Sequence, residues 1–317
     1  MIRRRHLIAA AALSPLAAPS LSHAQAARTV KMGSLRLIHS MTPHFYQRFA
    51  PAGLTIEVIT FDSPTDCKNA VVTGSVGFGG HGIAAGILGA AAGEPIVVVG
   101  GFCNKGMGVI AKKGSGITNI AGLRGKRVGI WPGSTQEVFI LERLRMNGMT
   151  VRDIQSIRVP FGEMNAMLAR GEIDAYVGAE PGPGLSISSG VGELVEYPYD
   201  TAMGGLNMIF STSQAMIDQD PALVRTMLDV HRKASEYMMA HKSEVAETTV
   251  RVLGAPRAAV EQALGADNVE YIWKLDDTVQ SQSRTYAEHM LSLRQIRQLP
   301  DFAKMLNARF SNEVASA

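Results

Sequence analysis

A short segment between a predicted strand and a predicted helix, Trp131-Pro132-Gly133-Ser134-Thr135, holds the residue types best suited to binding an anion. Ser134 and Thr135 can cap the helix, and Gly133 lets the backbone approach a ligand closely. The free N–H groups at a helix N-terminus favour a carboxylate, a sulfonate or another anionic group. An ordinary capped helix needs the same residues, so the segment is compatible with either role.

Two other junctions after predicted strands could face the same ligand. In Gly79-Gly80-His81-Gly82, the backbone of Gly80 and the imidazole of His81 would be accessible. A glycine-rich turn with a surface histidine is an equally good interpretation. In the segment 179–184, Glu180 could accept hydrogen bonds from ligand N–H or O–H groups, or it could be a solvated acid in a loop.

The remaining candidates follow the first predicted strand or lie on a strand that returns late in the chain. Ligands of α/β sheets bind beyond the carboxyl ends of the strands, so these positions are expected to meet at one cleft. The predicted ligand-binding set is Ser34, Leu35, His39, Gly80, His81, Trp131, Gly133, Ser134, Thr135, Glu180 and Asn207.

Motifs of known catalytic and metal chemistry do not occur in the sequence. It contains no Gly-x-Ser-x-Gly, His-Glu-x-x-His or Gly-x4-Gly-Lys-Ser motif, and no Cys-x-x-Cys. The eight histidines show no ligand spacing. We therefore expect no catalytic residue, no metal and no cofactor. Cys67 and Cys103 could form a disulfide in an oxidising compartment or remain two part-buried thiols.

Residues 1–26 have the pattern of a signal peptide. Arg3–Arg5 form a basic start, Leu7–Leu21 an apolar stretch, and a small-x-small cleavage site ends at Ala24 or Ala26. The run of arginines also fits a twin-arginine signal, so Sec and twin-arginine export both remain open. No cysteine lies at the cleavage site, which predicts a free periplasmic protein.

The basic charge of the chain comes from this leader. The whole sequence has 31 Lys+Arg against 28 Asp+Glu, but residues 1–26 contribute three arginines and no acid. The remainder is balanced, with 28 of each. Nothing in this balance favours nucleic acid or an anionic membrane as a partner, and we expect no insertion into the membrane.

After the leader, predicted strands and helices alternate, which indicates an α/β fold with parallel or mostly parallel sheets flanked by helices. We predict strands at Thr29–Leu37, Leu54–Phe61, Ser75–Phe78, Pro95–Val99, Arg127–Trp131, Ile154–Val159, Ala175–Gly178, Leu194–Tyr197 and Leu206–Ser211, with helices from Ser213 onward. The order suggests lobe one at 27–108 and 205–317, and an inserted lobe two at 109–204. The crossings near Gly106–Ala111 and Asp200–Leu206 would be the hinge.

Several segments resemble the periplasmic solute-binding proteins of ABC importers for nitrate, taurine and alkanesulfonates (the NitT/TauT type), a group related to binders of thiamine-pyrimidine precursors. They are Gly74–Gly80, with Val76 where that family usually has Asp, then 91–96, Ile120–Gly129, Pro132–Thr135, and Gly171–Tyr176 leading to Glu180-Pro181. The resemblance extends over about residues 29–300 and implies a two-lobed type II fold that closes on its ligand. It also implies that Ser134, Thr135, Gly80, His81 and Glu180 face the ligand.

From these observations we expect a monomeric, periplasmic, non-enzymatic substrate-binding component of an ABC importer, with a permease and an ATPase as partners. Its ligand would be a small organic solute, uncharged or anionic, such as a sulfonate or carboxylate. The cleft segments lack the aromatic residues and arginines of some anion binders. One alternative is an enzyme of the thiamine-pyrimidine-synthase type, which shares the fold and uses its own bound pyridoxal phosphate and a histidine. Another is a partner of a different transporter, or a sensor subunit.

Overall fold

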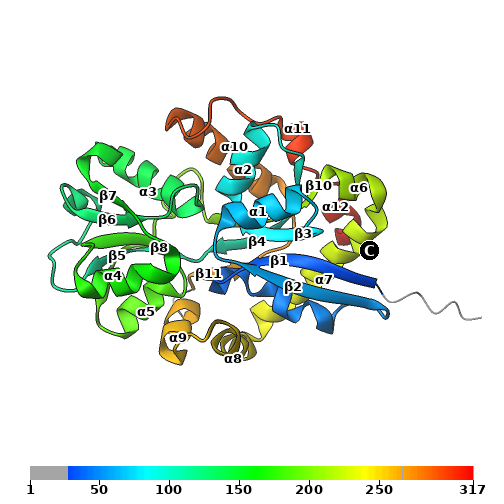
Figure 1. Cartoon of the computed structure of the whole chain (residues 1–317), viewed down its shortest axis with the longest axis horizontal. Helices are drawn as coiled ribbons and strands as arrows, with labels where there is room; N and C mark the ends of the chain where they lie inside the picture. Colours follow the sequence, from blue (N-terminus) through cyan, green and yellow to red (C-terminus); the bar gives the residue numbers. More distant parts are fainter. Residues whose placement is uncertain (1–27, 266, 317) are drawn as a thin grey trace, which may run out of the picture.

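Two lobes, each built on one β-sheet, make up the computed structural model, which describes residues 28–265 and 267–316 (Figure 1). The predicted signal peptide lies outside the described residues. The larger sheet has the strand order β11-β4-β10-β3-β1-β2. Its strands are β1 (Arg28–Leu35), β2 (Leu54–Phe61), β3 (Phe78–Gly82), β4 (Ile96–Lys105), β10 (Leu206–Ser213) and β11 (Val269–Tyr271).

The smaller sheet has the order β7-β6-β8-β5-β9. Its strands are β5 (Met107–Lys112), β6 (Arg127–Ile130), β7 (Gln155–Arg158), β8 (Ala175–Ala179) and β9 (Gly192–Glu196). In both sheets three strands pair in parallel, β2-β1-β3 in one and β7-β6-β8 in the other. The other strands pair antiparallel, so both sheets are mixed. This corrects the prediction of mostly parallel sheets.

Helices cover the sheets of both lobes, and six of those described begin at a residue whose side chain accepts a hydrogen bond from the first turn. These residues include Ser63, Ser134, Asp220 and Asp276. The helices are α1 (Pro64–Val72), α2 (Ile83–Ala91), α3 (Thr135–Met146), α4 (Met164–Arg170), α5 (Gly182–Ser188), α6 (Gln214–Gln219), α7 (Pro221–Ala240), α8 (Lys242–Leu253), α9 (Arg257–Gly265), α10 (Asp277–Ser292), α11 (Phe302–Met305) and α12 (Arg309–Ala315).

The glycine-rich segment after residue 78 is a strand and not the predicted strand-to-helix turn. Gly80 lies inside β3, where an added Cβ would come within 2.4 Å of the Phe102 ring from β4. Glycine is therefore needed for packing, and the segment forms β3, between β10 and β1 in the larger sheet. Thr42–Arg48 forms a 3-10 helix, and the short strand β11 lies within the region that was predicted to be helical from Ser213 onward.

The chain passes between the lobes at three places. The first is the turn between β4 and β5, where Gly106 has a φ of +81°. The second is the segment between β9 and β10. The third involves α9, which follows α8 of the larger lobe but packs against α5 of the smaller one before the chain returns as β11. At this contact an added Cβ on Gly184 would lie 2.4 Å from the carbonyl oxygen of Ala259.

Two features of the described residues bear on the predicted compartment. None of the described helices combines the length and the apolar character needed to cross a bilayer. Cys67 and Cys103 are both buried and both carry free thiols.

Candidate functional site

A cleft of about 580 Å³ lies between the two lobes, where the parallel strands of both sheets end. The larger lobe contributes residues that follow β1 and β2, and the smaller lobe contributes residues that follow β6, β7 and β8. This is the position at which open α/β sheets bind their ligands. The lining consists of Arg36, Leu37, Asp62, Ser63, Asp66, Trp131, Pro160, Phe161, Gly162, Glu163, Asn165, Ala179, Pro181, Gly182, Leu185 and Leu253.

The charged groups of the cleft are mainly acidic. Asp62 and Asp66 come from the larger lobe and Glu163 from the smaller one, against Arg36 as the only cation of the lining. Arg36 already donates to Asp62, with Nε 2.9 Å from Oδ1. Asp66 and Glu163 form no ion pair with any described residue. Excess negative charge in a cleft attracts cations and repels free anions.

Trp131 supplies an aromatic wall. The guanidinium of Arg158, at the end of β7, lies 5.0 Å from the centroid of the Trp131 ring. Phe161 is buried beside the same cleft. Aromatic surfaces of this kind can stack on a planar ligand, and the amide of Asn165 on α4 can hydrogen-bond to its edge.

The turn that follows Trp131 satisfies its own hydrogen bonds. The N–H of Gly133 donates to the carboxylate of Glu137 at 2.8 Å, and Ser134 Oγ accepts from the N–H of Glu137 at 3.2 Å. Burial raises the pKa of Glu137 above its usual value, and the bond from Gly133 opposes that shift. Ser134 and Thr135 are buried. Side chains of the protein thus accept hydrogen bonds from two of the N–H groups in the turn that we expected to bind an anion, those of Gly133 and Glu137.

Thr135 joins the two lobes. Its Oγ1 donates to the carbonyl oxygen of Asn207 on β10 at 3.2 Å, and it lies against Gly82 of β3. The side chain of Asn207 in turn donates to the carbonyl of Lys105 at the end of β4. Thr135 and Asn207, both predicted as binding residues, therefore contact each other, and their hydrogen bond joins the two lobes.

The residues predicted after the first strand are buried near the hinge. Ser34 Oγ donates to the carbonyl of Ser40 at 2.8 Å, and the N–H of Leu35 donates to Ser40 Oγ at 2.8 Å. His39 is 1% exposed, and its Nδ1 has no hydrogen-bond partner among the described residues. Its ring lies directly against Gly106. Burial lowers the pKa of His39 to about 3, so the ring is neutral.

Gly80 and His81 belong to the core of the larger lobe. His81 Nε2 lies 2.7 Å from Ser211 Oγ on β10, and Nδ1 lies 3.2 Å from the carbonyl of Gly82. Burial lowers the pKa of His81 to about 4. In this structure the imidazole lies inside the sheet, between β3 and β10.

Glu180 lies at the end of β8, buried at the hinge. Its Oε2 accepts from the N–H of Gly184 at 2.9 Å, and its Oε1 accepts from Asn268 Nδ2 at 3.1 Å. Burial raises its pKa to about 7, although both hydrogen bonds favour the charged form. Its neighbours Ala179 and Pro181 line the cleft, so Glu180 lies just behind the wall.

Of the predicted binding residues, only Trp131 is among those that line the cleft. The sequence analysis missed Arg36, Asp66, Phe161, Glu163 and Asn165. All of them follow β1, β2 or β7. The rule that ligands bind beyond strand ends would have found them if it had been applied to every predicted strand.

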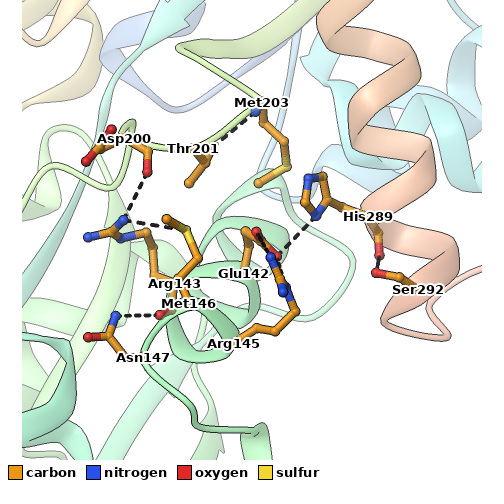
Figure 2. A network of polar contacts seen from close by, with 10 residues as sticks. All are labelled: Glu142, Arg143, Arg145, Met146, Asn147, Asp200, Thr201, Met203, His289 and Ser292. Carbon is orange, nitrogen blue, oxygen red and sulfur yellow. Dashed lines mark hydrogen bonds and ion pairs between the residues drawn. The ribbon is translucent and has the colours of Figure 1, made fainter.

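Away from the cleft, a second contact joins the lobes between α3 and α10 (Figure 2). The carboxylate of Glu142 accepts from Arg145 at 2.7 and 2.8 Å, and its Oε2 lies 3.1 Å from His289 Nδ1. Arg143, on the same helix, donates to the carbonyl of Asp200 at 3.0 Å, within the second crossing. Figure 2 shows the Glu142 carboxylate in contact with both Arg145 and His289.

A larger hollow, of about 700 Å³, lies at the start of β4 and beside α11. It belongs to the larger lobe alone and lies away from the carboxyl ends of the parallel strands. The described residues include no cluster of three or more His, Cys, Asp or Glu that could hold a metal ion. The interlobe cleft is therefore the best candidate for a ligand site.

Two lobes, joined by crossing segments and enclosing a cleft lined from both sides, define the class of two-lobed binding-protein folds. Residues 48–245 match the family model described as NMT1/THI5 like, and the chain belongs to this family. The alkanesulfonate-binding protein SsuA from Xanthomonas axonopodis pv. citri, solved with bound MOPS, is similar with a TM-score of 0.78 and 21% identity. The match covers 88% of this chain and 98% of that protein.

Two other similar proteins have different described roles. The periplasmic nitrate-binding protein NrtA from Synechocystis PCC 6803 has a TM-score of 0.78 and 16% identity, over 92% of this chain and 89% of its own. The 4-amino-5-hydroxymethyl-2-methylpyrimidine phosphate synthase of Candida albicans (strain WO-1) is 24% identical over 62% of this chain and 61% of the synthase. Across the matched synthases, the chain covers 39% to 65% of their length.

Proposed function

We propose that this protein is the substrate-binding component of an ABC importer. It captures a small organic solute in the interlobe cleft and delivers it to a permease that is coupled to an ATPase. The observation that carries this proposal is the cleft of about 580 Å³, built at the strand ends of both lobes. Two of the similar solved structures, SsuA from Escherichia coli and NrtA, are described as periplasmic binding proteins, which supports a periplasmic location with residues 1–26 as the export signal.

The chemistry of such a protein is closure. A ligand that contacts both lobes binds the closed state better than the open one, and it shifts the equilibrium by that difference in affinity. Here the larger lobe would offer Asp66 and Ser63, and the smaller lobe Trp131, Glu163 and Asn165. Such contacts can form together only when the lobes are close.

The lining of the cleft favours an uncharged or cationic solute with a planar part. Its carboxylates outnumber its single arginine, and that arginine is paired with Asp62. Two N–H groups at the start of α3, those of Gly133 and Glu137, already donate to the side chains of Glu137 and Ser134. These observations turn our proposal away from the sulfonate or carboxylate expected from the sequence.

The same lining supports binding over the pyridoxal-phosphate chemistry of the alternative enzyme. No lysine and no histidine is among the residues that line the cleft. His39 and His81 are buried, and their imidazoles lie against Gly106 and Ser211 respectively. Binding of a solute requires neither a nucleophile nor a base in the cleft.

A thermal-shift screen of the chain without its leader tests the proposal. The compounds are MOPS and taurine as sulfonates, nitrate, and 4-amino-5-hydroxymethyl-2-methylpyrimidine as an aromatic base. A ligand at 100 times its Kd adds about 2.7 kcal/mol to the free energy of unfolding. We expect stabilisation by the aromatic base or related amines, with compaction measured by small-angle scattering.

A pair of matched variants tests whether the acidic side chains of the cleft contribute to binding. Asp66→Asn combined with Glu163→Gln should weaken binding of a cationic hit, whereas Glu57→Gln, an exposed acid on β2, should leave it unchanged. Stabilisation by sulfonates or nitrate alone would contradict the proposed ligand class. Binding without compaction, or turnover of the bound compound, would contradict the transport role.

A further inference from the structure

The three crossings between the lobes meet at one cluster, made of Glu180, Asn268 and Tyr199. The N–H of Glu180 donates to the carbonyl of Gly106 in the first crossing at 2.9 Å. Its carboxylate accepts from Asn268, in the third crossing, at 3.1 Å. Asn268 Oδ1 lies 2.6 Å from the hydroxyl of Tyr199, which belongs to the second crossing. A single connected cluster therefore ties the whole hinge together.

The cluster also reaches the larger lobe and the cleft. The N–H of Ile38 donates to the carbonyl of Glu180 at 3.0 Å, across the interface between lobes. Ala179 and Pro181, on either side of Glu180, line the cleft. Glu180 therefore lies between the wall of the cleft and a backbone contact that joins the two lobes.

With Glu180 ionised, the hydrogen bonds of the cluster are complete. Asn268 Nδ2 donates to Glu180 Oε1 at 3.1 Å and to the carbonyl of Met107 at 3.2 Å. Tyr199 donates to Asn268 Oδ1 and accepts from the N–H of Met107 at 2.8 Å. Each acceptor has a donor.

With Glu180 protonated, the same positions support a second arrangement. The amide of Asn268 turns over, which is sterically neutral because its oxygen and nitrogen are nearly equal in size. The acid then donates to Asn268 Oδ1, Nδ2 donates to Tyr199, and the Tyr199 hydroxyl turns to the carbonyl of Met107, 2.9 Å away. In this arrangement the second Nδ2 hydrogen has no partner, and Asn268 Oδ1 takes the position 3.2 Å from the Met107 carbonyl oxygen, so the arrangement is favoured only when Glu180 holds a proton.

We propose that Glu180, Asn268 and Tyr199 are positioning residues that couple proton uptake to closure of the lobes. This inference rests on the proposed function, because it concerns regulation of the same cleft. Closure buries Glu180 away from water, which favours its neutral form, and the Asn268 amide accommodates the proton by turning over. Opening returns water to the carboxyl group and releases the proton. Closure, and with it retention of a ligand, is stronger at mildly acidic pH than at alkaline pH.

The surroundings of Glu180 contain no competing charge near neutral pH. Burial raises the pKa of Tyr176, Tyr197, Tyr199 and Tyr271 and of the Cys103 thiol, and it lowers the pKa of His39 to about 3. All six groups are therefore neutral, and burial alone raises the pKa of Glu180 to about 7 against its hydrogen bonds.

The first test needs no ligand. NMR of the protein with 13C-labelled glutamate carboxyls and 15N-labelled asparagine amides follows Glu180 and Asn268 together from pH 5 to 9. We expect one shared midpoint. Tyr199→Phe removes the hydroxyl that serves both arrangements and costs the protonated one an additional hydrogen bond. Its midpoint should fall by about one pH unit, since one hydrogen bond is worth about 1 kcal/mol.

Tyr197→Phe is the matched control, because Tyr197 stacks on Tyr199 with ring centroids 6.2 Å apart. In Tyr197→Phe the midpoint of the Glu180 titration should equal that of the wild type. A Glu180 midpoint near the ordinary value for glutamate, an Asn268 amide that does not follow it, or equal effects of the two tyrosine variants would overturn the inference.

The second test measures the lobes directly. Labels on Glu57→Cys and Arg152→Cys, both exposed and in different lobes, report the interlobe distance. We expect this distance to shorten as pH falls from 8 to 6, and Glu180→Gln to abolish the dependence. A distance that ignores pH in the wild type would refute the coupling. Failure of the ligand screen with these results intact would refute only the transport role.

Discussion

Glu142 and His289 belong to different lobes, yet Glu142 Oε2 lies 3.1 Å from His289 Nδ1 (Figure 2). The Glu142 side chain is only 3% exposed, and its other partner is Arg145 on the same helix. The contact therefore fixes α3 against α10 at some distance from the cleft. It gives the lobes an interface that does not depend on ligand.

Replacing Glu142 should weaken this interface. Glu142→Ala removes a buried acceptor and leaves His289 and Arg145 without it, which should cost about 1–3 kcal/mol of the free energy of unfolding. Glu172→Ala is the control, because Glu172 pairs with Arg170 on the exposed surface and its loss should change little. Urea unfolding of both variants provides the measurement, and equal midpoints for the two would contradict the role given to Glu142.

The contact between α9 and α5 should be intolerant of one methyl group. Gly184→Ala would place its Cβ 2.4 Å from the carbonyl oxygen of Ala259, so the two helices must separate. Overpacking of this kind costs about 1–3 kcal/mol. Gly265→Ala, at a glycine with open space around it, should be neutral or slightly stabilising. If thermal unfolding ranks the two variants alike, α9 does not pack on α5 in solution as it does here.

His231 should make the larger lobe sensitive to acid. It is fully buried between Tyr46, at 2.8 Å, and the carbonyl of Gly101, at 2.9 Å, and burial lowers its pKa to about 4. The unfolded chain binds a proton near pH 6.5, so this stabilisation is complete above that pH and is lost as pH falls through about 4.

The measurement for His231 is the free energy of unfolding between pH 8 and pH 4.5. His231→Gln should be less stable than the wild type at pH 8, and the gap should narrow as the pH falls. His241→Gln serves as the control, because the His241 side chain is exposed. Glu180 contributes in the opposite direction, since its raised pKa stabilises the folded state below about pH 7. A gap that stays constant with pH would show that His231 does not titrate as its burial requires.

The positions of most strands along the chain could be predicted from the sequence, because alternation and capping are local signals. Leu54–Phe61 was predicted with its observed bounds, and Ser134 caps α3 as expected. The direction of β10 and the pairing of β5 could not be predicted in the same way. Both depend on where the chain returns from the other lobe, which is a property of the tertiary fold.

The candidate cleft lies beyond the strand ends, as the sequence analysis assumed, but most of the predicted side chains do not line it. Local patterns drew attention to glycines and cap residues, and these proved to serve packing at Gly80 and the lobe contact at Thr135. Asp66 and Glu163 carry no local signature, because an exposed acid near the start of a helix is common wherever that helix lies. They become candidates only because the end of β2 and the end of β7 face each other across the cleft.

Trp131 should report ligand binding by itself, because the chain has just two tryptophans and the other, Trp273, lies outside the cleft. A compound selected by the thermal-shift screen should change the intrinsic fluorescence of the wild type and of Trp273→Phe. Trp131→Phe should abolish that change, and Trp131→Ala should weaken binding at least about tenfold, since an aromatic contact and its buried area are worth more than about 1.4 kcal/mol. Calorimetry on the same variants separates affinity from the optical signal. Full affinity in Trp131→Ala, or a signal that follows Trp273 instead, would move the binding site away from this cleft, because no other described wall of it offers an indole to a ligand.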